Sequence, residues 1–190
     1  MSHYSQLYKY QVRTEDCHLG TIIGTVIGSI IGNNVNDISD KMQVQANNVA
    51  IHYLRKLIIK SDSNLLHMYF SELIANTQQH AAHQSKHNSQ TKVHIRYNNA
   101  DKVHQLVYVE HGTALSDDEI AYIQLPLKTL DAAHSKLNNA GMGFTILQRI
   151  AELLSGNLKV ELIKNGDDNL QAHSQGHSDS SLVVMLEFPQ

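Results

Sequence analysis

The chain has 190 residues, of which 42% are hydrophobic and 17% are charged, and this composition indicates a globular protein and excludes an intrinsically disordered one. The length suits one domain of ordinary size, or one domain with a helical extension. The formal net charge of −3 provides no long-range attraction for nucleic acid or anionic lipid, so we expect neither as a partner.

The start of the chain and its cysteine content bear on the cellular compartment. Residues 1–16 contain no apolar stretch followed by a cleavage site, so they predict no secretory signal. The single cysteine, Cys17, excludes an internal disulfide framework and is typical of a reducing compartment. We therefore expect a cytoplasmic protein.

A glycine-rich segment is the most unusual feature of the first half. After a short strand expected over residues 6–14, glycine recurs at every fourth position from Gly20 to Gly32, with β-branched residues between (GTIIGTVIGSIIG). A glycine inside a helix costs about 1 kcal/mol relative to alanine, so a ridge of them indicates close backbone packing. We expect a buried or dimer-interface helix. β-Structure and membrane contact remain alternatives, although a bilayer span needs roughly 20 apolar residues.

Two more helices are expected before the middle of the chain. Residues 38–60 place apolar side chains near one helical face, with Lys56 and Lys60 near the C-terminal end, where cations suit the helix dipole. The sequence SDSN at 61–64 then supplies an N-cap for a helix that fades into a polar loop. Residues 1–60 would thus form a strand and a candidate dimerisation hairpin of two helices.

The helix after residue 61 carries a polar stripe. Glu72, Asn76 and His80 stand four residues apart, which places them on one helical face. An amide oxygen can ligate Mg²⁺, and a carboxylate one turn earlier can orient water or a hydroxyl nucleophile. The same spacing is also typical of an ordinary solvated helix face, so the stripe indicates a functional site only in combination with the motifs that follow.

The second half of the chain shows strand patterns as well as helical ones. Residues 92–112 indicate a β-hairpin, residues 116–123 a helical turn, and residues 143–156 an amphipathic helix that stops at a glycine. Two strands, NLKVELI and SLVVMLEFP, complete the chain. This order predicts an α+β fold, a two-layer sandwich in which helices cover one face of a mixed sheet.

Two further motifs carry chemistry. In YVEHGTAL, Glu110 ends a strand, where it can accept a hydrogen bond from a buried base. In NNAGMGF, Gly141 and Gly143 let the backbone approach a ligand, and the helix that begins there offers amide groups to a phosphate. Together with the polar stripe, these motifs indicate Mg-nucleotide chemistry.

The three motifs resemble those of the GHKL ATPases, and most closely those of bacterial sensor histidine kinases and anti-sigma-factor kinases. ELIANTQQHA looks like the N box, VEHGTAL occupies the place of the adenine-binding glycine box, and GMGFTILQRIAELLSGNLKVE is similar to the final glycine box with its helix and strand. The resemblance covers about residues 62–189. It implies the Bergerat fold, with ATP between the N-box helix and a lid over about residues 113–140.

The resemblance also implies roles for individual residues. Asn76 would ligate Mg²⁺, Glu72 would be the general base or the carboxylate that positions water, and Glu110 would read adenine. The other implied nucleotide contacts are His80, Gly112, Gly141, Met142, Gly143 and Phe144.

The chain departs from the family pattern at several of these boxes. The family usually has aspartate in place of Glu110, asparagine in place of His111 and glycine in place of Ala114. Asn139 stands where the last box normally has its first glycine, and Gln79 replaces a frequent basic residue. The longer arm of Glu110 requires either the base or the carboxylate to shift.

The expected function is that of a cytoplasmic signalling protein with an ATP-binding domain over residues 61–190. It would bind Mg-ATP and transfer phosphate to a protein such as a response regulator, a sigma factor or its antagonist. Two alternatives stay open. One is a histidine phosphotransfer protein that carries His18 on a helical hairpin beside a degenerate nucleotide fold, although His18 also suits a capping or surface role. The other is a module that sequesters a partner.

Overall fold

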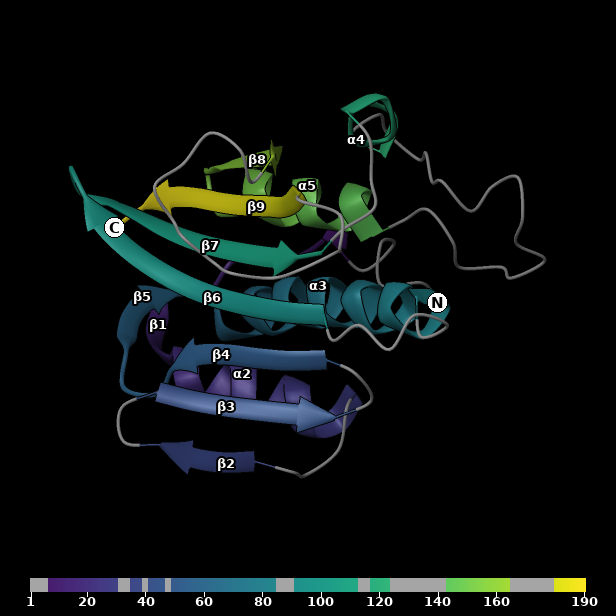
Figure 1. Ribbon diagram of the computed structural model, residues 1–190. Coiled ribbons are helices and arrows are strands. Elements are labelled where there is room, and N and C mark those ends of the chain that lie inside the picture. Colours follow the sequence, from purple (N-terminus) through teal and green to yellow (C-terminus); the bar gives the residue numbers. More distant parts are fainter. Residues whose placement is uncertain are drawn as a thin grey trace.

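The computed structural model describes residues 7–30, 35–38, 41–46, 49–84, 91–112, 117–123, 143–164 and 180–190. In this part of the chain a seven-stranded sheet has the order β2-β3-β4-β6-β7-β9-β8, and helices line one of its faces (Figure 1). A separate pair of short strands, β1 (Glu15–His18) and β5 (Ile58–Ser61), is antiparallel.

The large sheet is mixed. Its strands are β2 (Val35–Ile38), β3 (Lys41–Ala46), β4 (Val49–Leu54), β6 (Thr91–Ala100), β7 (Val103–His111), β8 (Asn157–Lys164) and β9 (Ser180–Pro189). Neighbouring strands are antiparallel except β4 and β6, which are parallel and therefore need the crossover that β5 and α3 (Ser63–Gln84) provide. The predicted α+β sandwich with a mixed sheet is confirmed.

Three helices form the second layer. Besides α3 these are α2 (Leu19–Ile30) and α5 (Gly143–Leu153), and all three lie behind the sheet in the view of Figure 1. α3 occupies the middle, between α2 and α5. The side chains that fill the space between the layers are apolar and fully buried, among them Ile51, Leu65, Leu66, Phe70, Ile74, Leu106, Leu147, Ile150 and Val184. The burial of this apolar surface is the main favourable term for the fold.

The glycine-rich segment forms the predicted helix, α2, and it is buried on one side. A Cβ atom at Gly20 would overlap the carbonyl oxygen of Arg55, and one at Gly24 would lie 3.2 Å from the hydroxyl of Tyr53. The glycines therefore let α2 approach β4 and the residue after it. At these two positions the ridge packs within one chain, and dimerisation through α2 stays a prediction.

The prediction of a helix over residues 38–60 is wrong. The structure has strands there: β3 pairs with β4, and β4 pairs with β6, so the residues before 61 share a sheet with those after it. In VAIHYL the apolar residues Val49, Ile51 and Tyr53 alternate along the strand and face the core. This two-residue period outweighs the weaker helical period, because the neighbouring strands satisfy the backbone on both sides.

The strand predicted over residues 6–14 is also wrong. The segment forms no strand in its described part, and the first strand begins at Glu15. Its polar groups bind Asp62 instead, which accepts hydrogen bonds from the Tyr10 hydroxyl (2.8 Å) and the Arg13 amide (2.7 Å). Asp62, one of the four residues in the predicted N-cap cluster SDSN, caps α3, since its Oδ1 accepts from the backbone amides of Asn64 and Leu65, both at 3.0 Å.

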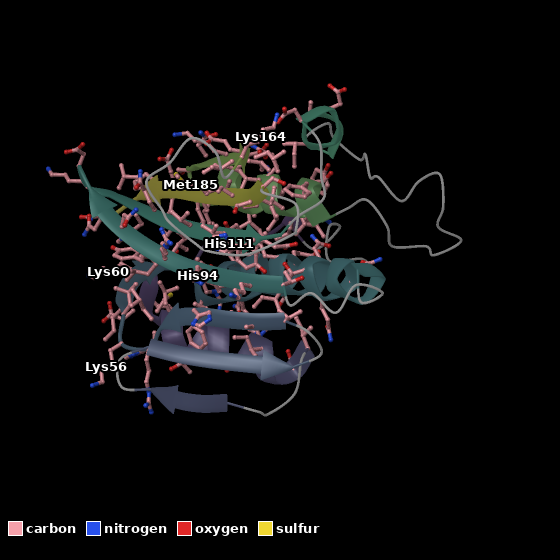
Figure 2. The ribbon with its side chains drawn as sticks, in the orientation of Figure 1. Lys56, Lys60, His94, His111, Lys164 and Met185 are labelled. Atoms are coloured by element: carbon pink, nitrogen blue, oxygen red, sulfur yellow. The ribbon has the colours of Figure 1, made fainter. Side chains whose placement is uncertain are left out.

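The second half matches its predicted elements closely. The hairpin of β6 and β7 is confirmed, and its turn falls at Asp101 and Lys102, whose φ angles are 53° and 62°. The helical turn α4 (Asp117–Ile123) is present, and an ion pair of 2.8 Å joins Asp117 to Lys164 of β8 (Figure 2). Among the helices that the structure describes, none combines the length and apolar character that a membrane crossing requires.

Candidate functional site

The site begins where α3 meets the first residue of α5. A Cβ atom at Gly143 would lie 2.9 Å from Nδ2 and 3.5 Å from Oδ1 of Asn76, so the amide of Asn76 rests directly against the glycine. Asn76 itself is half-buried. The first amides of a helix have no acceptor within that helix, so the start of α5 brings hydrogen-bond donors next to the Asn76 side chain.

The second part of the site joins α3 to β7. Glu110 lies on β7 between Val93 of β6 and Leu182 of β9, with its side chain on the helix face of the sheet and only 6% exposed. The Thr77 hydroxyl donates a hydrogen bond to its carboxylate. The same hydroxyl lies 2.7 Å from the hydroxyl of Tyr108.

Because Asn76 and Thr77 are consecutive, these contacts meet at one place in the fold. Asn76 contacts Gly143 of α5, and Thr77 contacts Glu110 of β7. Asn76 of the polar stripe, the strand-end acid Glu110 and Gly143, the first residue of α5, thus lie around the middle of α3. The spacing of these residues in the sequence does not reveal that they lie close together. Their proximity results from the register of β7 between β6 and β9.

The electrostatics of this cluster follow from burial. Burial raises the pKa of Tyr108 well above its usual value, and the negative charge of Glu110 raises it further. Tyr108 is therefore a permanent hydrogen-bond donor near neutral pH. Burial likewise raises the pKa of Tyr69, which lies two turns before Thr77 on α3. Its hydroxyl has no hydrogen-bond partner among the described residues.

The remaining predicted site residues have different placements. Glu72 lies one turn before Asn76 on α3 and is half-buried, and Phe144 packs against the main core. Gly112 has a φ of 82° and donates its amide to the carbonyl of Ser180 at 3.1 Å. The positive φ is what favours glycine here, because a Cβ added at this position would meet nothing within 4 Å and sterics with neighbours therefore play no part.

Three predicted positions can be placed only in part or not at all. His80 belongs to α3, one turn after Asn76, but its side chain lies outside the described residues. Gly141 and Met142 lie outside them entirely, as does most of the predicted lid over 113–140.

His18 is the exposed last residue of β1, where it pairs with Ile58.

Sequence reasoning missed Thr77 and Tyr108. Thr77 follows Tyr69 and Leu73 at four-residue intervals, in a row of otherwise apolar residues on α3. A hydroxyl in such a row is a usable signal, because a buried hydroxyl needs a partner. The partner itself could not be named without the strand register.

A second group of polar side chains lies on the opposite face of the sheet. The rings of His52 and His94 have centroids 4.8 Å apart, and those of His94 and His111 are 5.1 Å apart, so the three histidines cross β4, β6 and β7 (Figure 2). Burial, followed by the neighbouring His111 and His52, lowers the pKa of His94 to about 4. Among the described residues, no three His, Cys, Asp or Glu side chains are arranged to hold a metal ion.

Comparison with protein families gives a match over residues 61–189 to the family described as histidine kinase-, DNA gyrase B-, and HSP90-like ATPase. The chain belongs to this family. Membership supports ATP binding and a kinase-type function. No curated protein sequence matches the chain significantly.

Solved structures of histidine kinases share the fold of this ATPase family member. A mycobacterial sensor histidine kinase, MprB, is 12% identical with a TM-score of 0.59, and the match covers 94% of this chain and 100% of that one. The Acinetobacter baumannii histidine kinase AdeS is 11% identical with a TM-score of 0.57, covering 97% and 72%. The histidine kinase domain of the E. coli osmosensor EnvZ is 16% identical with a TM-score of 0.51, covering 95% and 91%. The predicted Bergerat fold is confirmed.

Proposed function

We propose that this chain binds Mg-ATP between α3, β7 and α5 and transfers the γ-phosphoryl group to a protein side chain in a cytoplasmic signalling pathway. The observation that carries the proposal is the convergence of Asn76, Gly143 and Glu110 around the middle of α3 in a member of this ATPase family. If the polar stripe were only a solvated helix face, Asn76 would not be expected to contact the start of α5.

Asn76 and Gly143 would form the metal and phosphate end of the site. The Asn76 amide oxygen would ligate Mg²⁺, and the absence of a Cβ at Gly143 leaves room for that amide beside the amides of α5. A helix N-terminus attracts phosphate through its free amides and its dipole. Gly141, Met142, Phe144 and His80 would complete the phosphate contacts.

Glu110 would form the other end of the site. A buried carboxylate held on a strand is a suitable acceptor for the exocyclic amine of adenine, because that hydrogen bond is charge-assisted. Gly112 would bring the backbone past the base at the end of β7. The family has aspartate at this position, and the hydrogen bond from Thr77 shows where the longer side chain of Glu110 goes.

Phosphoryl transfer would depend mainly on positioning and charge stabilisation. Glu72, one turn before Asn76, would orient the attacking hydroxyl or water near the γ-phosphate. The acceptor would be a side chain of a regulated protein, such as a response regulator, a sigma factor or its antagonist. These partners come from the family resemblance.

Titration with ATP in the presence and absence of Mg²⁺ tests the proposal. The wild-type chain should bind Mg-ATP saturably, and at about a hundred times the dissociation constant the fold should gain about 2.7 kcal/mol, seen as a higher melting temperature. Asn76→Ala should abolish the dependence on Mg²⁺. Gln148→Ala is the matched control, since Gln148 is exposed on α5. Absence of saturable binding by the wild-type chain would refute the proposal.

The histidine phosphotransfer alternative loses part of its basis. It required a helical hairpin with His18 on one helix, whereas His18 ends β1 and the described residues of 38–60 contain no helix. Phosphate recovered on His18 from a phosphorylated response regulator would restore it. Capture of a partner that is unaffected by Asn76→Ala would favour the sequestering module instead.

A further inference from the structure

The Thr77 hydroxyl lies between two buried polar groups. It donates to the carboxylate of Glu110 and contacts the hydroxyl of Tyr108 at 2.7 Å. All three residues are buried, with exposures of 1% for Thr77, 1% for Tyr108 and 6% for Glu110. They come from α3 and β7, so the cluster also ties the helix layer to the sheet.

The direction of these hydrogen bonds follows from counting protons. An ionised carboxylate only accepts hydrogen bonds, and a threonine hydroxyl carries one proton. If Thr77 gives that proton to Glu110, Tyr108 must donate its own proton to the Thr77 oxygen. The order Tyr108 to Thr77 to Glu110 is the one that gives each of these contacts a donor and an acceptor.

This order fixes the position of a flexible side chain. Glutamate has one more rotatable bond than aspartate, and ordering it costs conformational entropy. Thr77 is itself stiff, because branching at Cβ restricts its χ1 angle. In helices such hydroxyls often bond back to their own backbone, whereas this one bonds across to the sheet.

We propose that Thr77 is the positioning residue that holds Glu110 as a hydrogen-bond acceptor for the nucleobase, and that it thereby sets a preference for a base with an amino group over one with a keto group. The inference rests on the proposed nucleotide site. A carboxylate offers about four acceptor positions, so it can accept from Thr77 and from a ligand N–H at the same time. A keto oxygen at the same place would face the carboxylate as a second acceptor and would be repelled.

The test compares the dissociation constants of Mg-ATP and Mg-inosine triphosphate, which differ at the base position that carries the amino or keto group. The wild-type chain should prefer ATP. Thr77→Val keeps the shape and removes the hydroxyl, and it should reduce the preference about tenfold, the effect of losing one hydrogen bond to a charged group. Thr77→Ser should restore most of the preference.

Two controls separate positioning from a structural effect. Tyr69→Phe removes a buried hydroxyl from the same helix that has no partner among the described residues, and it should leave the ratio of the two constants unchanged. In a Glu110→Gln background, Thr77→Val should have no further effect on the ratio, because Thr77 acts through Glu110. If Thr77→Val does not fold, Thr77→Ala serves the same comparison.

The possible failures are distinguishable. If the wild-type chain binds neither nucleotide, the proposed function is refuted and the inference with it. If the wild-type chain prefers ATP and the hydroxyl-free variants keep that preference, the nucleotide site stands and the role of Thr77 is refuted. If Thr77→Val weakens both nucleotides equally, Thr77 is structural only, which also refutes the inference.

Discussion

The amide of Asn76 fills the space that a Cβ at Gly143 would need, so the start of α5 can carry only a glycine unless the amide moves. A Cβ at this position would come within 2.9 Å of Nδ2, closer than such atoms normally approach. The contact sets the distance between the proposed metal ligand and the proposed phosphate-binding helix. It ties two boxes that are 67 residues apart in the sequence, at positions 76 and 143.

Gly143→Ala should weaken Mg-ATP binding by at least about tenfold while leaving the fold nearly as stable as before. The three atoms nearest to the new methyl group all belong to the end of the Asn76 side chain, which can rotate away and lose its place at the metal. Calorimetric titration gives the affinity, and urea unfolding gives the stability. Gln148→Ala on α5 should change neither, and unchanged affinity in Gly143→Ala would contradict the role of this contact.

The glycine ridge of α2 gives a paired prediction about stability. Gly20→Ala should destabilise the fold by about 1–3 kcal/mol, because its Cβ would overlap the Arg55 carbonyl group of the backbone. Gly24→Ala should be close to neutral, since the nearest atom is the Tyr53 hydroxyl at 3.2 Å and alanine gains about 1 kcal/mol of helix propensity. Urea unfolding of both variants measures the difference. Equal effects would show that the ridge does not pack as described.

The sequence predicted the second half of the fold better than the first, for a physical reason. In α5 and in the hairpin of β6 and β7, local turn residues, caps and periodicity all favour the same element. Over residues 38–60 they conflict, since lysines near the end suit a helix while Val49, Ile51 and Tyr53 suit a strand. The parallel partner of β4 is β6, which lies beyond α3 in the sequence. A pairing at that distance has no local signal.

The candidate site shows the same division. Asn76 and Gly143 could be proposed from motif spacing, because each belongs to a box with a recognisable order of residues. Thr77 and Tyr108 could not, because their role depends on which face of β7 meets α3. A shift of one residue in strand register would turn Glu110 to the other face of the sheet.

Substitution of Asp62 should destabilise the fold more than most substitutions outside the site. Its carboxylate caps α3 and also holds the N-terminal segment through Tyr10 and Arg13. Asp62→Ala should cost about 2–4 kcal/mol, the sum of a lost cap and of partly buried donors left without their acceptor. Asp62→Asn should cost less, because its amide oxygen can still cap the helix. Tyr10→Phe, which removes one of these bonds, should cost about 1 kcal/mol.

Unfolding in urea measures these stabilities, and limited proteolysis reports on the N-terminal segment. In Asp62→Ala the segment should become cleavable before the core, since its anchors to α3 are lost. Equal protection of the segment in Asp62→Ala and the wild-type chain would show that Asp62 serves only as a cap.

The histidines on the outer face of the sheet should make the fold sensitive to acid. Burial is the main reason that the pKa of His94 is lowered to about 4, and the groups that add to it are His111, His52, Arg96 and Lys92. In the unfolded chain the same histidine has a pKa of about 6.5, so between these values the unfolded state binds more protons than the folded state. Stability should therefore fall as the pH drops below about 6.5, and this contribution should level off below about pH 4.

His94→Gln removes the central proton acceptor and should reduce the loss of stability between pH 7 and pH 4.5. The comparison is of urea midpoints at a series of pH values, with His18→Gln as the control, because His18 is exposed on β1 away from this row of rings. The burial of His52 and His111 lowers the pKa of each, so part of the acid sensitivity should remain in the variant. If His94→Gln loses as much stability on acidification as the wild-type chain, His94 is not the source of the effect.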